Sequence, residues 1–196
     1  MPEAIAKTMT VAIVGAGPLG RSLALRAAQA GLHVVLEDVM PANLRHAQEA
    51  LRASLGESLM AEQNGAAPRV RFATTIEDAV REAEIAIDCV PDELESKLEI
   101  FSLLDRMAPP RTILMTPMQA VSIADLAACT YRAERCVAIA LPAQALTTAA
   151  LTAAAATKIP LVRTGKTLPE VEQQVREFWQ CLGCTVEFAT DGGAGR

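Results

Sequence analysis

Residues 10–38, TVAIVGAGPLGRSLALRAAQAGLHVVLED, constrain the fold of this chain more than any other stretch. A short apolar run leads into Gly15-Ala16-Gly17-Pro18-Leu19-Gly20, which is a complete G-x-G-x-x-G. Apolar residues at helical spacing follow, Gly31 closes that helix, and a second apolar run ends in Glu37 and Asp38. The order of strand, glycine turn, helix and strand predicts a β-α-β unit.

Each glycine of the turn has its own physical role. Gly15 permits the sharp turn out of the strand, Gly17 lets a pyrophosphate approach the backbone, and Gly20 lets the helix lie close to the sheet. The first N–H groups of a helix have no internal acceptor and can bind phosphates. Pro18 removes an N–H that the helix does not use. The alternative is a glycine turn that only packs, but this alternative leaves the following acid unexplained.

The acids at the end of the second apolar run indicate which dinucleotide is bound. Asp38 lies at the distance from the glycines at which an acid accepts hydrogen bonds from a ribose 2′-hydroxyl. Glu37 and Asp38 would both repel a 2′-phosphate, so the sequence favours NAD over NADP. Arg45 is the one nearby cation, and we expect it a turn or more into the next helix.

Length and charge exclude several classes of protein. The 196 residues fit one domain, which we place at 1–196 with a loose lead-in at 1–9 and a flexible tail at 190–196. A formal net charge of −5 argues against nucleic-acid binding. No apolar stretch approaches the ~20 residues of a membrane helix, and the first residues lack a signal peptide. We expect a cytoplasmic protein with no membrane or nucleic-acid partner.

The five cysteines do not predict a metal site. Cys181 and Cys184 form a lone C-x-x-C, whereas zinc would need a second pair or histidines. A redox pair is the alternative, but this motif ends a helix and does not begin one. We interpret the segment as a helix C-terminus at Leu182-Gly183 followed by a strand.

The rest of the chain alternates between apolar runs and helical patterns. We expect strands at 70–73, 85–90, 112–115, 136–140, 159–163 and 185–189. We expect helices at 41–63, 74–83, 91–108, a brief one from 122, and 167–182, with an Ala- and Thr-rich segment at 144–157 that could be helical. Thr74-Thr75-Ile76-Glu77 and Thr167-Leu168-Pro169-Glu170 have the form of capping boxes. This alternation predicts an α/β, Rossmann-type, doubly wound and mainly parallel sheet in a single domain.

The order of these motifs resembles the NAD-binding domain of the 3-hydroxyacyl-CoA dehydrogenases. The matching segments are VAIVGAGPLGRSLALRAAQAGLHVVLEDV, TTIEDAVREAEIAIDCVPDELESKLEIFSLLDRMAPPRTIL, VSIADLA, AERCVAIA and TLPEVEQQVREFWQCLGCTVEF. The resemblance implies an NAD-dependent oxidoreductase of fatty acid metabolism, acting on a 3-hydroxyacyl-CoA or a related hydroxy acid.

The resemblance also assigns cofactor contacts. It implies that Gly15, Gly17 and Gly20, with the backbone of Pro18 and Leu19, hold the pyrophosphate. It implies that Asp38 holds the adenosine ribose, that Val90 and Pro91 line the cofactor cleft, and that Lys97 lies near the nicotinamide ribose. For Lys97 the alternative is a solvated lysine on an acidic helix.

The catalytic residues of the family do not carry over, so the catalytic residues of this chain stay unknown. Gln119 stands where the family has a substrate-contacting serine, Ala140 where it has the catalytic histidine, and Thr152 near the position of the glutamate that orients the histidine. The family continues into a helical domain that closes over the acyl-CoA and forms the dimer interface, and this sequence stops at Arg196, where that domain would begin. A homo-oligomer or a partner chain could supply what is missing.

Three hypotheses follow from the sequence. The first is an oxidoreductase related to 3-hydroxyacyl-CoA dehydrogenase, and the second is a catalytically inactive NAD(H)-binding sensor or regulatory module. The third is a domain that keeps the fold without the cofactor, against which the intact glycine turn argues. A relationship to the 6-phosphogluconate dehydrogenase type stays open, although the segment DCVPDELESK fits that type less well.

Overall fold

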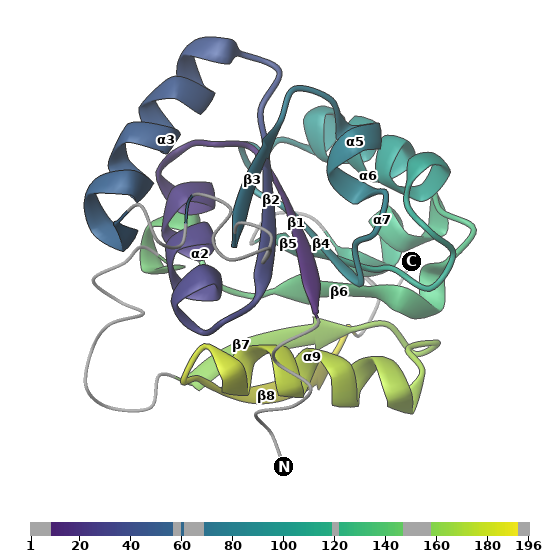
Figure 1. The fold of residues 1–196 in the computed structure, drawn as a ribbon. Coiled ribbons are helices and arrows are strands. Elements are labelled where there is room, and N and C mark those ends of the chain that lie inside the picture. The colour runs from purple at the N-terminus through teal and green to yellow at the C-terminus, as the bar shows by residue number, and fades with distance from the viewer. Residues whose placement is uncertain (1–8, 57–59, 61–68, 119–121, 147–157, 192–196) are drawn as a thin grey trace.

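The computed structural model describes residues 9–56, 60, 69–118, 122–146 and 158–191. Within these residues eight strands form one sheet in the order β3-β2-β1-β4-β5-β6-β7-β8 (Figure 1). The strands are β1 (Thr10–Val14), β2 (His33–Glu37), β3 (Val70–Ala73), β4 (Ile85–Asp88), β5 (Ile113–Pro117), β6 (Cys136–Ile139), β7 (Lys158–Arg163) and β8 (Thr185–Thr190). The helices are α2 (Pro18–Gln29), α3 (Pro41–Leu55), α5 (Ile76–Val80), α6 (Leu94–Met107), α7 (Ile123–Ala128) and α9 (Pro169–Cys181), with 3-10 turns η1 (Ala133–Arg135) and η2 (Ala143–Leu146).

The direction of the strands confirms a mainly parallel, doubly wound sheet. All neighbours from β3 to β6 are parallel, and the strand order reverses between β1 and β4. β7 runs antiparallel to β6, and β8 runs parallel to β7. The last two strands, β7 and β8, therefore run opposite to the other six. An apolar run in the sequence predicts a strand but not the direction of that strand in the sheet.

Helices cover both faces of the sheet and divide the core into two layers. Buried residues of α2, α3 and α9 pack with one set of strand side chains, and buried residues of α5, α6 and α7 pack with the alternate set. The first layer contains Ile13, Leu36, Ile87 and Leu161, and the second contains Val14, Val35, Leu114 and Ala138. Because helices cover both faces of the sheet, the side chains on both faces of its strands are mostly apolar.

The ends of several helices differ from the sequence expectation. α3 ends at Leu55 and not near position 63, and Gly56 follows with a φ of +73° that only glycine adopts readily. Thr75, not Thr74, caps α5, because its hydroxyl accepts the N–H of Asp78. α5 stops at Val80, short of the expected position 83.

Two further helix starts also differ. α6 begins at Leu94, three residues after Pro91, and Leu94 itself is exposed and does not face the core. The expected capping box before α9 does not form, since Leu168 is the N-cap and makes no side-chain bond there. The Thr167 hydroxyl instead accepts the N–H of Thr164.

Both chain ends reach further into the fold than expected. Met9 is buried in the core and its carbonyl accepts the N–H of His33, so it is not part of a loose lead-in. Thr190 belongs to β8 and not to a flexible tail. Asp191 accepts the Ser122 hydroxyl and the N–H of Ala124, which ties the end of β8 to the capped start of α7. Residues 1–8, 192–196 and most of 144–157 lie outside the described residues.

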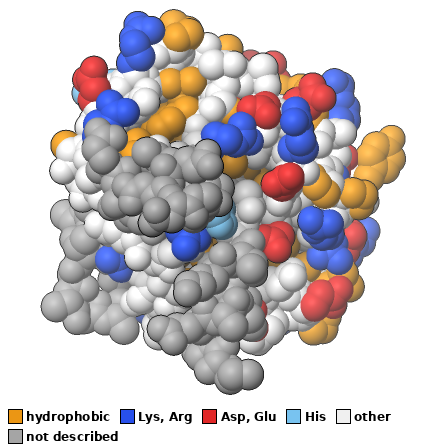
Figure 2. All heavy atoms as spheres, in the orientation of Figure 1, with side chains coloured by type: hydrophobic (Ala, Val, Ile, Leu, Met, Phe, Trp, Pro, Cys, Tyr) orange, Lys and Arg blue, Asp and Glu red, His pale blue; other side chains and the backbone are white. Residues whose placement is uncertain are grey.

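The surface is mixed in charge on the face that Figure 2 shows. Acidic and basic side chains lie interspersed, and the described residues form no continuous basic surface there. None of the helices in the described part of the chain is long and apolar enough to cross a membrane.

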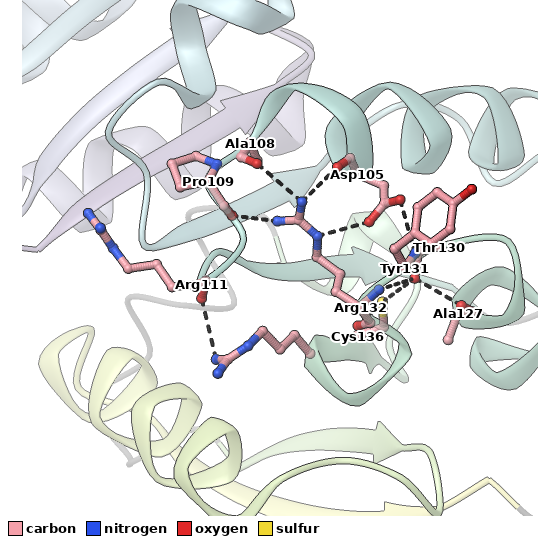
Figure 3. Close-up of polar contacts among 10 residues, drawn as sticks. Asp105, Ala108, Pro109, Arg111, Ala127, Thr130, Tyr131, Arg132 and Cys136 are labelled. Carbon is pink, nitrogen blue, oxygen red and sulfur yellow. Dashed lines mark hydrogen bonds and ion pairs between the residues drawn. The ribbon is translucent and has the colours of Figure 1, made fainter.

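A buried arginine closes the C-terminal end of α6 (Figure 3). The Arg132 guanidinium donates to the Asp105 carboxylate at 2.9 Å and to the carbonyl oxygens of Asp105, Ala108 and Pro109 at 2.6, 3.1 and 2.6 Å. The other oxygen of the Asp105 carboxylate accepts the N–H of Tyr131. The last carbonyls of a helix have no internal donor, so Arg132 satisfies them and joins α6 to the start of η1.

We predict that Arg132→Met lowers the free energy of unfolding by about 3–5 kcal/mol, because it leaves the buried Asp105 charge without its partner. Arg135→Met is the matched control. Its side chain is partly buried, but its ion-pair partner at 3.6 Å, Glu170, is exposed to solvent, and its loss should cost less than about 1 kcal/mol. Chemical denaturation measures both variants. Equal effects would contradict a structural role for the Arg132 network.

Candidate cofactor site

The glycine turn has the geometry that the sequence predicts. Gly15 has a φ of +103°, and its N–H donates to the Glu37 carbonyl at 2.8 Å. A Cβ on Gly20 would lie 1.8 Å from the Gly15 carbonyl oxygen, so only glycine permits this approach of α2 to β1. A Cβ on Gly17 would meet no atom within 4 Å. The backbone at Gly17 therefore faces open space, as a phosphate-binding turn requires.

The Asp38 carboxylate already accepts hydrogen bonds from its own chain. One oxygen accepts the N–H of Ala16 at 2.9 Å, and the other accepts the N–H of Met40 at 2.8 Å. The side-chain amide of Asn43 reaches both oxygens at 3.1 and 3.2 Å. Asp38 thus links the glycine turn to the start of α3, and a ribose would compete with the exposed Asn43 side chain for its oxygens.

A cavity of about 460 Å³ opens beside the glycine turn, at the carboxyl ends of the strands. It lies where the order reverses between β1 and β4, which is the place where open α/β sheets bind ligands. Seven of the predicted site residues line it, namely Gly15, Gly17, Pro18, Leu19, Asp38, Val90 and Pro91. Asn43, Cys89, Asp92, Pro117, Met118, Leu141 and Pro142 complete the lining. Gly20 and Lys97 are the two predicted residues that do not line it.

Lys97 is buried, so the alternative of a solvated lysine is wrong. Its side chain is 1% exposed, and its ammonium lies 3.0 Å from Asp88 and 3.2 Å from the Val90 carbonyl oxygen. Asp88 also accepts the Thr116 hydroxyl and the N–H of Val90. Burial raises the pKa of Asp88, and the charge of Lys97 opposes this rise. The pair joins α6 to β4 and β5 behind the cavity wall.

Sequence reasoning missed Asp88, although a signal was present. It is the one acid in the apolar run 85–90, and a charged residue in a buried strand requires a partner. The partner of Asp88 is Lys97, a cation later in the same β-α unit.

A second cavity, of about 590 Å³, lies on the other side of Asp38. It shares Gly15, Asp38 and Val90 with the first cavity. Its walls come from the end of β2, the β3–α5 turn and α6, and include Ile76, Ile100, Leu103 and Met107. Glu37 is part of its lining. The sequence predicted Glu37 only as a repulsive charge and did not indicate this cavity.

The cysteines do not form a reactive or metal-binding group in the described residues. Cys181 and Cys184 are free thiols, and burial raises the pKa of both. No cluster of three or more His, Cys, Asp or Glu side chains suited to a metal occurs within the described ranges. α9 ends at Cys181 and β8 begins at Thr185, with Gly183 at a φ of +77° between them, which confirms the interpretation as a helix end followed by a strand.

Ala140, which the resemblance aligns with the family's catalytic histidine, directly follows β6. Ala140 lines a small cavity with Met118, Ser122 and Asp191. Its methyl side chain cannot accept a proton. Gln119 and Thr152 lie outside the described residues.

The fold and the site together define a dinucleotide-binding Rossmann domain. Residues 10–186 match the family model described as "3-hydroxyacyl-CoA dehydrogenase, NAD binding domain". The chain belongs to this family, and the cofactor of its domain is NAD.

Similar proteins include several dehydrogenases. The "Probable 3-hydroxybutyryl-CoA dehydrogenase" of Bacillus subtilis is 33% identical over 131 residues, which cover 64% of this chain and 45% of that protein. The L-carnitine dehydrogenase of Pseudomonas putida is 30% identical over 139 residues, which cover 68% of this chain and 42% of that protein. The crystal structure of (S)-3-hydroxybutyryl-CoA dehydrogenase from Ralstonia eutropha shares the fold, with a TM-score of 0.77 at 22% identity over 93% of this chain and 64% of that chain. This chain matches less than half the length of either curated relative.

We predict that Gly17→Leu keeps the fold but loses NAD binding, because its side chain would fill open space that the pyrophosphate needs. Gly20→Ala should instead lower the free energy of unfolding by about 1–3 kcal/mol, because its methyl group would collide with the Gly15 carbonyl. Thermal denaturation and calorimetric titration with NAD separate the two effects. Normal NAD binding by the Gly17→Leu variant would mean that the turn does not hold the pyrophosphate.

A second prediction concerns the competition at Asp38. Asp38→Ala should weaken NAD binding by ~1–3 kcal/mol through loss of a hydrogen bond to a charged group. Asn43→Ala should strengthen binding by about 0.5–1.5 kcal/mol, because it removes a donor that the ribose must displace. Titration calorimetry measures both. Weaker binding by the Asn43→Ala variant would show that Asn43 is a ligand and not a competitor.

Proposed function

We propose that this chain is the NAD-binding part of an oxidoreductase that acts on a 3-hydroxyacyl-CoA or a related hydroxy acid in fatty acid metabolism. The observation that carries the proposal is the cavity at the β1–β4 reversal, lined by the glycine turn and Asp38. The names of the matched relatives supply the reaction class.

The residues of the cavity divide the binding of NAD between them. The first N–H groups of α2, at Leu19 and Gly20, have no acceptor within the helix and lie at its positive end, which suits a pyrophosphate. Asp38 would accept the adenosine ribose hydroxyls. Val90 and Pro91 would form the wall of the cleft, and Lys97 would fix this wall from behind by donating to the Val90 carbonyl oxygen.

Oxidation of a hydroxyl needs two acceptors. NAD, when bound, supplies the hydride acceptor, and a base must take the hydroxyl proton. Among the described residues that line the cavity, the titratable side chains are Asp38, Cys89 and Asp92. Asp38 is held by its own donors, burial raises the pKa of Cys89 so that it stays a thiol, and Asp92 is exposed at the rim. We therefore assign the base to a segment outside the described residues or to a partner chain.

A catalytically inactive NAD(H)-binding module is the second candidate, and Ala140 is the observation that favours it. The two curated relatives compared above carry dehydrogenase names, which gives this alternative no support. Binding and turnover therefore have to be measured separately.

The test combines calorimetry with NAD and NADH and an assay of NADH formation from 3-hydroxybutyryl-CoA at high protein concentration. We expect saturable binding of NAD, weakened in the Asp38→Ala variant, together with NADH formation. Binding without any turnover would favour the inactive module. No binding of either nucleotide would overturn both candidates.

A further inference from the structure

Glu37 is a buried acid whose carboxyl has no partner within the described part of the chain. It is 4% exposed, and no hydrogen bond or ion pair to its side chain is formed by the described residues. The other buried acids are all satisfied: Asp38 by Ala16, Met40 and Asn43, Asp88 by Lys97, and Asp105 by Arg132. Buried polar groups in native proteins have partners. Glu37 lines the second cavity, so a ligand that enters this cavity can supply the partner that the described residues do not.

The position of Glu37 directs its carboxyl toward the second cavity. It is the last residue of β2 and shares a face of the strand with Val35, which packs against the α5–α6 layer. Burial, together with the smaller effect of the neighbouring Asp38 charge, raises the pKa of Glu37 to about 7. A carboxyl in this state is unfavourable in the empty protein and favours a ligand that offers it an N–H donor.

The lining of the second cavity limits what that ligand can be. Ile76, Ile100, Leu103 and Met107 provide apolar walls suited to a flat ring. The other charged residues that line the cavity with Glu37 are Asp38 from the β2–α3 turn, Glu77 from α5 and Glu99 from α6. Val14 of β1 and Val90, which follows β4, are also part of the lining. No basic side chain of the described residues lines the cavity. The site therefore excludes a phosphate and accepts a neutral heterocycle that carries a hydrogen-bond donor.

The geometry of the two cavities places the adenosine half of NAD here. The first cavity includes Met118 and Pro142, which follow β5 and β6, whereas the second is lined by the β3–α5 turn and α6, and the two cavities share Asp38. With the pyrophosphate on the glycine turn and the ribose at Asp38, the base lies in the second cavity. The exocyclic amino group is the only N–H donor of the adenine ring.

We propose that Glu37 selects the base of the dinucleotide by accepting a hydrogen bond from the 6-amino group of adenine. This inference rests on the proposed binding of NAD, and it adds a specificity-determining residue to that site. Glu37 then distinguishes adenine from a 6-oxopurine, while Asp38 addresses the ribose.

The test is the ratio of dissociation constants for nicotinamide hypoxanthine dinucleotide and NAD, measured by calorimetry. In the hypoxanthine analogue a carbonyl oxygen replaces the amino group and the N–H of the ring lies beside it at N1, so a carboxylate positioned for the 6-amino group would meet the oxygen. At pH 8.5 the ionised Glu37 can only accept, so the wild-type chain should prefer NAD by about tenfold or more. At pH 6.0 the protonated carboxyl can donate to that oxygen, so the preference should decrease.

Two variants at position 37 and one control complete the design. Glu37→Met removes the acceptor, and Glu37→Gln can both donate and accept, so both should bind the two dinucleotides about equally at either pH. Glu49→Gln removes a charge from the exposed face of α3, where it lines neither cavity, and should leave the ratio unchanged. Thermal denaturation confirms that each variant is folded.

The outcomes separate this inference from the proposed function. If the wild-type chain binds neither dinucleotide, the proposed function fails. If it binds NAD but shows the same ratio as Glu37→Met, the assignment of Glu37 is wrong while NAD binding stands. A ratio that depends on pH in the wild-type chain and not in Glu37→Gln supports the assignment.

Discussion

The close approach of α2 to β1 is the contact on which the rest of the site depends. Without a side chain at Gly20, the helix lies against the Gly15 carbonyl, and its N-terminal end faces the cavity. Two hydrogen bonds then fix the turn to β2, one from Gly15 N–H to the Glu37 carbonyl and one from Ala16 N–H to Asp38. Backbone geometry thus creates the phosphate site, and the acids of β2 are positioned by the same contacts.

A second constraint acts through α6, which forms one wall of the second cavity. Lys97 fixes the first turns of this helix to Asp88, and Arg132 binds the carbonyls at its last turn. Both ion pairs are almost completely buried. We interpret these pairs as the elements that fix α6 against β4 and against the start of η1, and so position the wall that α6 contributes to the cavity.

The parts of the site made by local sequence could be predicted, and the parts made by long-range packing could not. The glycine turn and Asp38 lie within one β-α-β unit, so their spacing alone places them. Lys97 is buried because it pairs with Asp88 in the preceding strand. The role of Glu37 depends on the cavity that it lines together with α6, and the sequence of β2 does not indicate that α6 lies nearby. The antiparallel pairing of β7 was missed for a similar reason, because partner choice is decided by the whole sheet.

NAD binding and proton transfer require different features of the chain. This difference explains why the residues that bind NAD are easier to recognise than the residue that would accept a proton. A pyrophosphate is held by backbone N–H groups, which almost any sequence can offer once the glycines are in place. Proton transfer instead needs one titratable side chain at one position, and the resemblance aligns Ala140, which follows β6, with the family's catalytic histidine. Glu37 has a suitable pKa of about 7, but it lines the cavity on the far side of Asp38 from Met118. We therefore interpret its carboxyl as a group that recognises a base and not as the proton acceptor of a reaction.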